Sequence, residues 1–139
     1  MQKSEKFLFC GAIVRKQNKS LKTKLRKKYG ITKGKFTVVA SFGGGGSKWH
    51  KTILRKYFTA IRIAATKIQN LSAITITGPN YKKTNGFGKT EMFEPYLLEL
   101  MSVANLVVTH AGYNSVNELL AAKTPGIIIP RPVDKHPEN

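Results

Sequence analysis

FTVVASFGGGGS, residues 36–47, decides the fold class of this 139-residue chain. Its first six residues form a mostly apolar run without alternation, which is typical of a strand buried on both faces of a parallel sheet. Four glycines end the run, and from residue 50 to residue 70 apolar side chains recur every three or four positions, as on an amphipathic helix. A strand, a glycine turn and a helix together indicate a parallel α/β sheet.

The same alternation continues on both sides of this unit. Further strands are predicted at residues 73–77, 91–93, 105–109 and 126–129, and further helices at residues 16–28, 96–103 and 115–122. Ahead of them, FLFCGAIV at residues 7–14 predicts an extended segment. The whole pattern predicts one α/β domain with a parallel sheet.

Composition narrows the class of protein. Cys10 is the sole cysteine, which excludes an internal disulfide framework and a cysteine-based zinc site. No apolar run reaches the length of a membrane span, so the sequence favours a cytoplasmic protein. Residues 134–139 are polar and end without a closing element, which favours a chain cut from a longer one.

Charge is distributed unevenly along the chain. Lys and Arg number 24 against 7 Asp and Glu, a formal net charge of +17. Residues 1–90 hold 21 of these basic residues and only Glu5 on the acidic side. Such a field attracts nucleic acid, anionic lipid surfaces and phosphorylated ligands. The alternative is a solvated basic face without a specific partner.

Two loops are predicted at the carboxyl ends of strands, where open parallel sheets bind ligands. The first contains Gly44, Gly45, Gly46 and Ser47. Glycines let backbone N–H groups approach a phosphate closely, and the helix that follows adds a favourable dipole. The spacing fits neither the P-loop motif nor the dinucleotide fingerprint. A flexible strand-to-helix turn remains the alternative.

The second loop is HAGYNSVNE, residues 110–118. Asn114, Ser115 and free backbone N–H groups would point at the same edge of the sheet, and the Glu118 carboxylate could accept two hydrogen bonds from a ribose diol. Ser115 and Glu118 also have the spacing of a capping box, which gives Glu118 a purely structural alternative. His110 could cap or pack, and no cluster of His, Cys and carboxylates indicates a metal.

These residues carry a family resemblance. The GGGS loop, the HAGYNSVNE loop, Lys-Thr-Pro at 123–125 and Ile-Ile-Ile-Pro-Arg at 127–131 resemble the C-terminal half of family 28 glycosyltransferases, the MurG-type enzymes. The resemblance implies the C-terminal half of a GT-B fold, a Rossmann-like parallel sheet with helices on both faces. It makes residues 1–139 a single nucleotide-sugar-binding domain truncated at both ends, with no cofactor and no metal.

Individual site residues follow from the resemblance alone. It implies that Glu118 holds the ribose hydroxyls and that backbone atoms of Phe93 and Glu94 meet the uracil edge. The diphosphate would be contacted by Gly44, Gly45, Gly46 and Ser47 together with Gly112, Asn114 and Ser115. His110 stands where the peptidoglycan enzyme has an arginine and would face the diphosphate. Glu138 would bind the sugar, although a glutamine typical of the family is absent beside it.

The resemblance implies the donor-binding domain of an enzyme that moves a hexosyl or N-acetylhexosaminyl group from a UDP-sugar to an acceptor. The family's acceptor site and catalytic base lie in an N-terminal domain or partner subunit, so the chain alone should be inactive. Lipid-linked acceptors are common in the family, which implies peripheral contact with an anionic membrane surface. Alternative functions are half of a nucleotide-sugar 2-epimerase and a basic nucleic-acid-binding module. The second is disfavoured because no nucleic-acid-binding motif is present.

Overall fold

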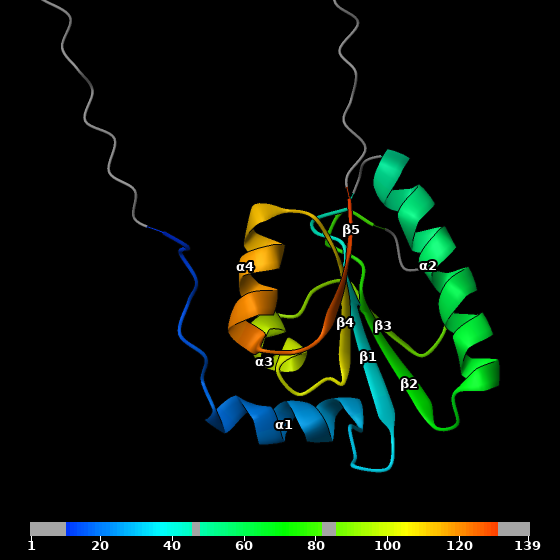
Figure 1. Ribbon diagram of the computed structural model, residues 1–139, viewed down its shortest axis with the longest axis horizontal. Coiled ribbons are helices and arrows are strands. Elements are labelled where there is room, and N and C mark those ends of the chain that lie inside the picture. Colours follow the sequence, from blue (N-terminus) through cyan, green and yellow to red (C-terminus); the bar gives the residue numbers. More distant parts are fainter. Residues whose placement is uncertain (1–10, 46–47, 82–85, 131–139) are drawn as a thin grey trace, which may run out of the picture.

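The computed structural model describes residues 11–45, 48–81 and 86–130. Its elements follow in the order α1 (Ser20–Tyr29), β1 (Phe36–Ser41), α2 (Lys48–Lys67), β2 (Leu71–Ile76), β3 (Lys89–Glu91), α3 (Leu97–Met101), β4 (Leu106–His110), α4 (Tyr113–Ala122) and β5 (Gly126–Ile129). Strands and helices alternate from β1 onward (Figure 1). The α/β class predicted from the sequence is confirmed.

The five strands form one parallel sheet in the order β3-β2-β1-β4-β5. The apolar run at residues 36–41 is the central strand, as its sequence predicts, and Val39 pairs with Ile74 on one side and Val107 on the other. The chain runs outward from β1 through β2 to β3 and then returns to the opposite side of β1. The carboxyl ends of β1 and β4 therefore flank the point where the strand order reverses, which is the ligand-binding position of open α/β sheets.

Helices cover both faces of the sheet, as predicted (Figure 1). Successive residues of a strand point to opposite faces, so Val39 packs with α1, α3 and α4 while Val38 packs under α2. The α2 layer rests on a buried stripe that includes Leu54, Tyr57 and Ile61. These two apolar layers hold the carboxyl edge of the sheet in place.

The segment before α1 differs from its prediction. Residues 7–10 lie outside the described part of the chain, and residues 11–14 do not join the sheet. The basic helix begins at Ser20, four residues later than the predicted start at Lys16. Residues 17 and 18 instead form hydrogen bonds to distant parts of the chain. The Gln17 side-chain amide donates to the Ala121 carbonyl, and the Asn18 N–H donates to the Glu99 carboxylate. The predicted stop at Gly30 is confirmed, with Gly30 in the left-handed conformation at φ 67°.

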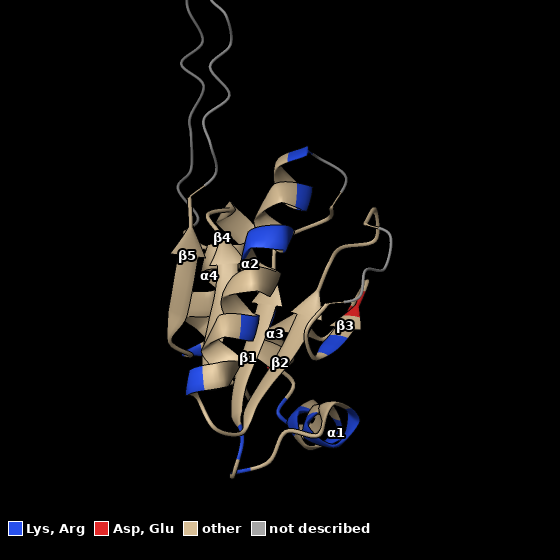
Figure 2. Ribbon diagram, turned by 90° about the vertical axis from the view of Figure 1, so that its right-hand side faces the viewer, with Lys and Arg blue, Asp and Glu red and all other residues tan. Residues whose placement is uncertain are grey.

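Lys and Arg positions concentrate along α1 and α2 (Figure 2). Neither helix has an acidic residue in its first turn, and α2 carries six basic residues and no acidic one. Within the described ranges, no helix is long and apolar enough to cross a membrane. The basic charge is therefore displayed on the outer faces of two amphipathic helices.

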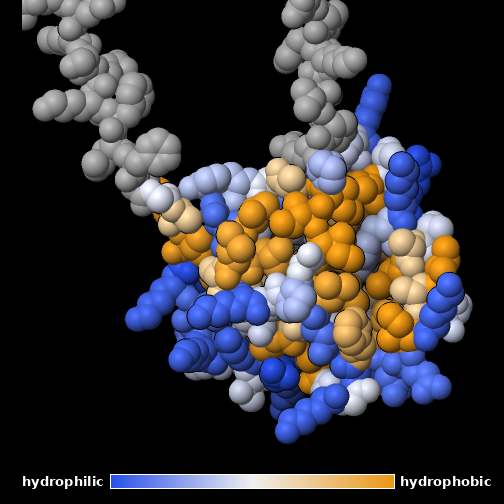
Figure 3. Space-filling model, viewed as in Figure 1, coloured by the Kyte–Doolittle hydropathy of each residue, from blue (hydrophilic) through white to orange (hydrophobic). Residues whose placement is uncertain are grey.

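An apolar groove of about 330 Å³ lies between α2 and the sheet. Its walls include Ile53, Ala60 and Ala64 from α2 and Ile127 and Ile129 from the edge strand β5. Figure 3 shows hydrophobic surface across this side of the molecule, framed by hydrophilic side chains. Ile127 is 52% exposed, which is high for an isoleucine in a sheet.

Candidate functional site

A cavity of about 230 Å³ opens at the carboxyl edge beside the switch point. It is lined by Phe42, the glycines at 43–45, Trp49, His50 and His110. The structure thus brings Gly44 and Gly45 of the first predicted loop together with His110 of the second. Gly46, Ser47 and Glu138 lie outside the described residues.

The glycine loop needs its glycines for conformation and for close approach. Gly43 and Gly45 have φ values of 88° and 79°, a region that residues with a side chain rarely adopt. A Cβ added at Gly78, in the loop after β2, would overlap the Gly43 carbonyl oxygen. The Asn80 N–H donates to the Gly44 carbonyl over 3.0 Å. The β2–β3 loop therefore holds one side of the glycine loop by direct backbone contact.

His110 joins the two predicted loops. It is the last residue of β4, not the first residue of a loop as the sequence predicted, and it is buried. A Cβ added at Gly112 would stand 2.6 Å from its Nε2 atom, and one added at Gly43 would stand 3.1 Å from its Cε1 atom. The Trp49 ring lies edge-on at 5.9 Å between centroids. Glycine at positions 43 and 112 therefore makes room for this imidazole.

His50 is a component of the site that sequence analysis did not assign. It lies in the first turn of α2 and is only 3% exposed. Its Nδ1 atom lies 3.2 Å from the Phe42 carbonyl and its Nε2 atom 2.7 Å from the Thr77 carbonyl. A single histidine therefore spans the ends of β1 and β2. Its sequence position, on the apolar side of the helix, was the one available signal.

The start of α4 tests the structural alternative for Glu118, the capping box with Ser115. The helix begins at Tyr113 with Gly112 as its N-cap, and no side chain caps it. Ser115 is thus the third residue of the helix, so the predicted Ser115–Glu118 capping box is wrong. Gly112 has extended geometry, at φ −98° and ψ 143°, and can end the preceding strand without a capping side chain. The N–H groups of the first turn are therefore left for another acceptor.

Glu118 lies one turn further along α4 and is half-buried. Burial raises its pKa, the nearby Arg15 guanidinium lowers it, and the Glu99 carboxylate raises it; the net result is a pKa above the ordinary value. Glu118 therefore sits in a cluster with one cation and a second carboxylate. A hydrogen-bond donor that arrived at this carboxylate, such as a hydroxyl, would relieve its unfavourable burial.

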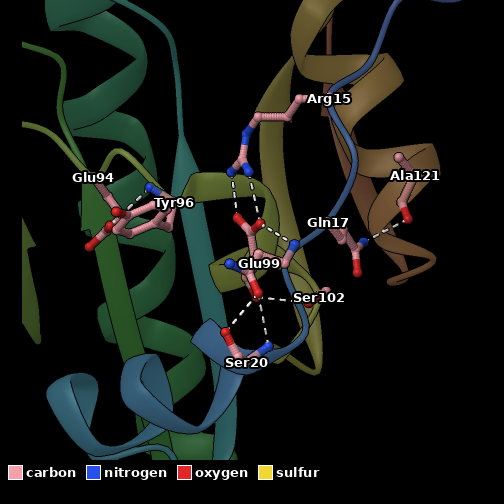
Figure 4. A network of polar contacts seen from close by, with 9 residues as sticks. Arg15, Gln17, Ser20, Glu94, Tyr96, Glu99, Ser102 and Ala121 are labelled. Carbon is pink, nitrogen blue, oxygen red and sulfur yellow. Dashed lines mark hydrogen bonds and ion pairs between the residues drawn. The ribbon is translucent and has the colours of Figure 1, made fainter.

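Arg15 and Glu99 form the centre of that cluster (Figure 4). The guanidinium donates to both carboxylate oxygens of Glu99, with Nη1 at 2.8 Å from Oε1, and the Asn18 N–H donates to Oε1 at 2.8 Å. Glu99 is fully buried, which by itself raises its pKa, but these donors outweigh burial and hold the pKa below the ordinary value. The pair fixes the chain before α1 against α3.

Glu94 is held in the same manner by α1. Its Oε2 atom accepts from Lys28 at 2.7 Å and from the Tyr29 hydroxyl at 2.6 Å, and its Oε1 atom accepts from the Tyr96 N–H at 3.0 Å. Burial raises the pKa of Glu94, but these donors outweigh it and lower the pKa overall. Its carboxylate is occupied, which leaves the backbone of Phe93 and Glu94 as the part that a ligand can contact. Phe93 itself is 66% exposed.

Two further features bear on ligand binding. Among the described residues, no group of three His, Cys, Asp or Glu side chains could hold a metal ion. A depression of about 300 Å³ lies at the opposite, amino edge of the sheet and is lined in part by Arg26, Lys33 and Lys35. The described chain thus offers two polar hollows, one at each end of the strands.

The open sheet with a glycine loop at its switch point defines a Rossmann-like α/β domain. The family model described as "Glycosyltransferase family 28 C-terminal domain" matches residues 14–139, so the chain belongs to this family. The family resemblance in the sequence is thereby confirmed.

Several curated proteins are similar to this chain. An uncharacterized glycosyltransferase of Methanopyrus kandleri is 30% identical over 82% of this chain and 31% of that protein. A UDP-N-acetylglucosamine–N-acetylmuramyl-(pentapeptide) pyrophosphoryl-undecaprenol N-acetylglucosamine transferase of Fusobacterium nucleatum is 30% identical over 94% of this chain and 38% of its own length. The transferase of the same name from Geobacillus kaustophilus is 28% identical over 91% and 36%. This chain thus spans about a third of these relatives, and no solved structure matches it.

Proposed function

We propose that this chain binds the donor of a glycosyltransferase, a UDP-sugar, at the carboxyl edge of its sheet. The observation that carries the proposal is the meeting of the glycine loop and the start of α4 on either side of His110, at the switch point of a family 28 C-terminal domain. Two backbone segments that lie on either side of one imidazole, the first of them lining the cavity, suit a ligand with two linked phosphates.

The diphosphate is assigned to these two segments. Gly44 and Gly45, together with Gly46 and Ser47, contribute one set of donors. Asn114 and Ser115 contribute the other, at the N-terminus of a ten-residue helix that no side chain caps, and Gly112, whose N–H donates to the His110 carbonyl, brings its backbone close to the phosphates. His110 lies between the sets and faces the phosphates.

The nucleoside is assigned to the α3 and α4 side of the edge. Glu118 accepts hydrogen bonds from the ribose hydroxyls, which fits a half-buried carboxylate whose pKa is raised by burial. Backbone groups of Phe93 and Glu94 contact the uracil, and Lys28 and Tyr29 hold this segment through the Glu94 carboxylate. Glu138 is the proposed sugar contact.

Transfer requires parts that these residues do not supply. The names of the two transferase relatives include UDP-N-acetylglucosamine and a pyrophosphoryl-undecaprenol compound, which correspond to donor and acceptor. We extend both classes to this chain as its proposed donor and acceptor, with the acceptor site and the catalytic base on an N-terminal domain or partner subunit. The basic faces of α1 and α2 would then approach an anionic membrane surface, where each Lys or Arg contributes about 1 kcal/mol in low salt.

Titration calorimetry of the full chain with UDP, UDP-N-acetylglucosamine and NAD tests the proposal. The uridine nucleotides should bind more tightly than NAD, because the dinucleotide fingerprint and its ribose carboxylate are absent from the first loop. Lys51→Gln, an exposed change on α2 outside the cavity lining, is the matched control for charge and should leave the preference unchanged. Preferential binding of NAD would contradict the proposal.

A further inference from the structure

Three backbone contacts link the glycine loop to the loop after β2. Asn80 donates to the Gly44 carbonyl, Gly78 lies against Gly43 and Gly44, and the Tyr81 backbone and Cβ would stand 3.1 Å from a Cβ at Gly45. A peptide group is planar and trans, so its carbonyl and its N–H point in opposite directions. Holding the Gly44 carbonyl toward Asn80 therefore directs the Gly45 N–H away from the β2–β3 loop.

His50 closes this arrangement at its base. Phe42 and Thr77, whose carbonyls it contacts, immediately precede Gly43 and Gly78, the glycines at which the two loops touch. A carbonyl oxygen can only accept, so the ring nitrogen that carries the proton donates, and the Nε2 contact with Thr77 is the shorter of the two at 2.7 Å. Because His50 is 3% exposed, bulk water is largely kept away from both contacts.

The environment of the ring restricts it further. The Tyr81 ring packs against the His50 ring at 5.5 Å between centroids. The backbone of His50 is held in the first turn of α2. One side chain thus couples three segments, namely the end of β1, the end of β2 and the start of α2. Each of them borders the cavity or supports a segment that does.

We infer that His50 is a positioning residue for the diphosphate, which holds the glycine loop in its ligand-ready conformation by joining the Phe42 and Thr77 carbonyls. This inference rests on the proposed function, since it assigns the diphosphate to the glycine loop. Both ring nitrogens of His50 face backbone carbonyls, so the residue acts on the phosphates through the loop. Preorganisation of this kind strengthens phosphate binding because the ordering of the loop has already taken place.

The test separates the phosphates from the nucleoside. Dissociation constants for UDP and for uridine are measured by NMR titration of the full chain and of its variants. His50→Ala should weaken UDP binding by about tenfold, the ratio that corresponds to the net contribution of about one hydrogen bond, and should leave uridine binding unchanged. The ratio of the two constants is therefore the diagnostic quantity.

Conservative variants distinguish positioning from general stability. The amide nitrogen of Gln reaches the place of Nε2 and that of Asn the place of Nδ1, so His50→Gln should restore much of the UDP preference through Thr77, and His50→Asn less. Leu54→Ala is the matched control, because Leu54 is fully buried in the same helix and its apolar side chain can donate a hydrogen bond to neither carbonyl. It should lower the melting temperature without changing the ratio.

Hydrogen exchange at the Asn80 amide gives a readout that needs no nucleotide. In His50→Ala this amide should exchange faster, since its acceptor at Gly44 is no longer held, whereas in Leu54→Ala at a matched fraction unfolded it should not. An unchanged UDP-to-uridine ratio in His50→Ala, or an equal loss in Leu54→Ala, would overturn the inference while leaving the proposed function intact. Failure of the unsubstituted chain to bind UDP would overturn both the inference and the proposed function. Unaltered exchange of the Asn80 amide in His50→Ala would by itself refute the role of His50 in holding the glycine loop.

Discussion

At the residue scale, three carboxylates among the described residues differ in how they are held. Glu94 and Glu99 are buried carboxylates saturated by donors from α1 and from the segment before it. Glu118 is half-buried, and burial raises its pKa. A carboxylate that lacks strong donors costs free energy, so a ligand hydroxyl at Glu118 gains more than one at Glu94 or Glu99 would.

Glu118→Gln separates binding from stability. With no capping box in α4, a neutral amide at this position should change the free energy of unfolding by less than about 0.5 kcal/mol. UDP affinity should fall by about 1.5–3 kcal/mol, the range of a hydrogen bond to a charged group. Thermal melts and calorimetry on the same preparation measure both quantities. Equal losses in stability and affinity would show that Glu118 has a structural role only.

Acid should destabilise the domain through Glu94 and Glu99. Both have a pKa in the folded state below the ordinary value, so each contributes stability above that ordinary value and loses it as the pH falls through the folded-state pKa. The melting temperature should therefore drop steeply below about pH 4.5, the range in which unfolded glutamates take up protons. Glu99→Gln should be less stable at pH 7 by about 1.5–3 kcal/mol and should lose less on acidification. If Glu99→Gln lost as much stability on acidification as the unsubstituted chain, Glu99 would not be a source of the acid sensitivity.

At the element scale, apolar patterning located the strands that lie inside the sheet and missed features set by long-range contacts. The continuous runs at 36–41 and 126–129 predicted β1 and β5 with their observed bounds. β3 was placed two residues late, because Lys89–Glu91 is a polar edge strand without an apolar signal. The start of α1 depends on bonds from Gln17 and Asn18 to residues more than 80 positions away, which no local pattern contains.

The site shows the same division. Local glycine patterns predicted both loops and the edge of the sheet that they share. They did not predict that His110 would pack between glycines 43 and 112, nor that His50 would span two strand ends, since these contacts depend on the pairing of β1 with β2 and β4. The S-x-x-E spacing misled because the helix starts three residues earlier than the motif requires, with Gly112 rather than Ser115 as its N-cap.

Gly78→Ala tests the contact between the two loops. The substitution places a methyl group against the Gly43 carbonyl and forces an alanine to adopt φ 90°, so the loops must separate. We expect the free energy of unfolding to fall by about 1–3 kcal/mol and UDP binding to weaken. Gly34→Ala, where an added Cβ meets nothing within 4 Å and φ lies outside the positive region, is the matched control. Similar effects of the two substitutions would contradict the role of this contact.

At the scale of the whole molecule, the described residues include the groups proposed to bind the donor, and their two histidines and two most buried glutamates are engaged in other contacts. The imidazoles of His50 and His110 are buried in contacts with the glycine loop, and Glu94 and Glu99 are tied in ion pairs. A base must lie within hydrogen-bond reach of the acceptor hydroxyl. This arrangement suits a domain that holds one substrate for chemistry completed by another part of an enzyme.

The chain alone should therefore release UDP from UDP-N-acetylglucosamine only at the slow rate of donor hydrolysis by water. Addition of an N-terminal half from a family 28 transferase, together with a lipid-linked acceptor, should raise the rate. A coupled assay for UDP measures both conditions, and the N-terminal half by itself is the control. Acceptor-dependent release of UDP by this chain alone would show that a base lies within its 139 residues.

Amide chemical-shift mapping of the isotope-labelled chain on titration with UDP locates the uridine diphosphate on the domain. If it binds at the carboxyl edge of the sheet, the largest shifts should fall at Gly43, Gly44 and Gly45 and along the first turn of α4, with smaller ones near Phe93. Shifts that instead gather around Arg26, Lys33 and Lys35, in the basic depression at the opposite edge, would contradict it.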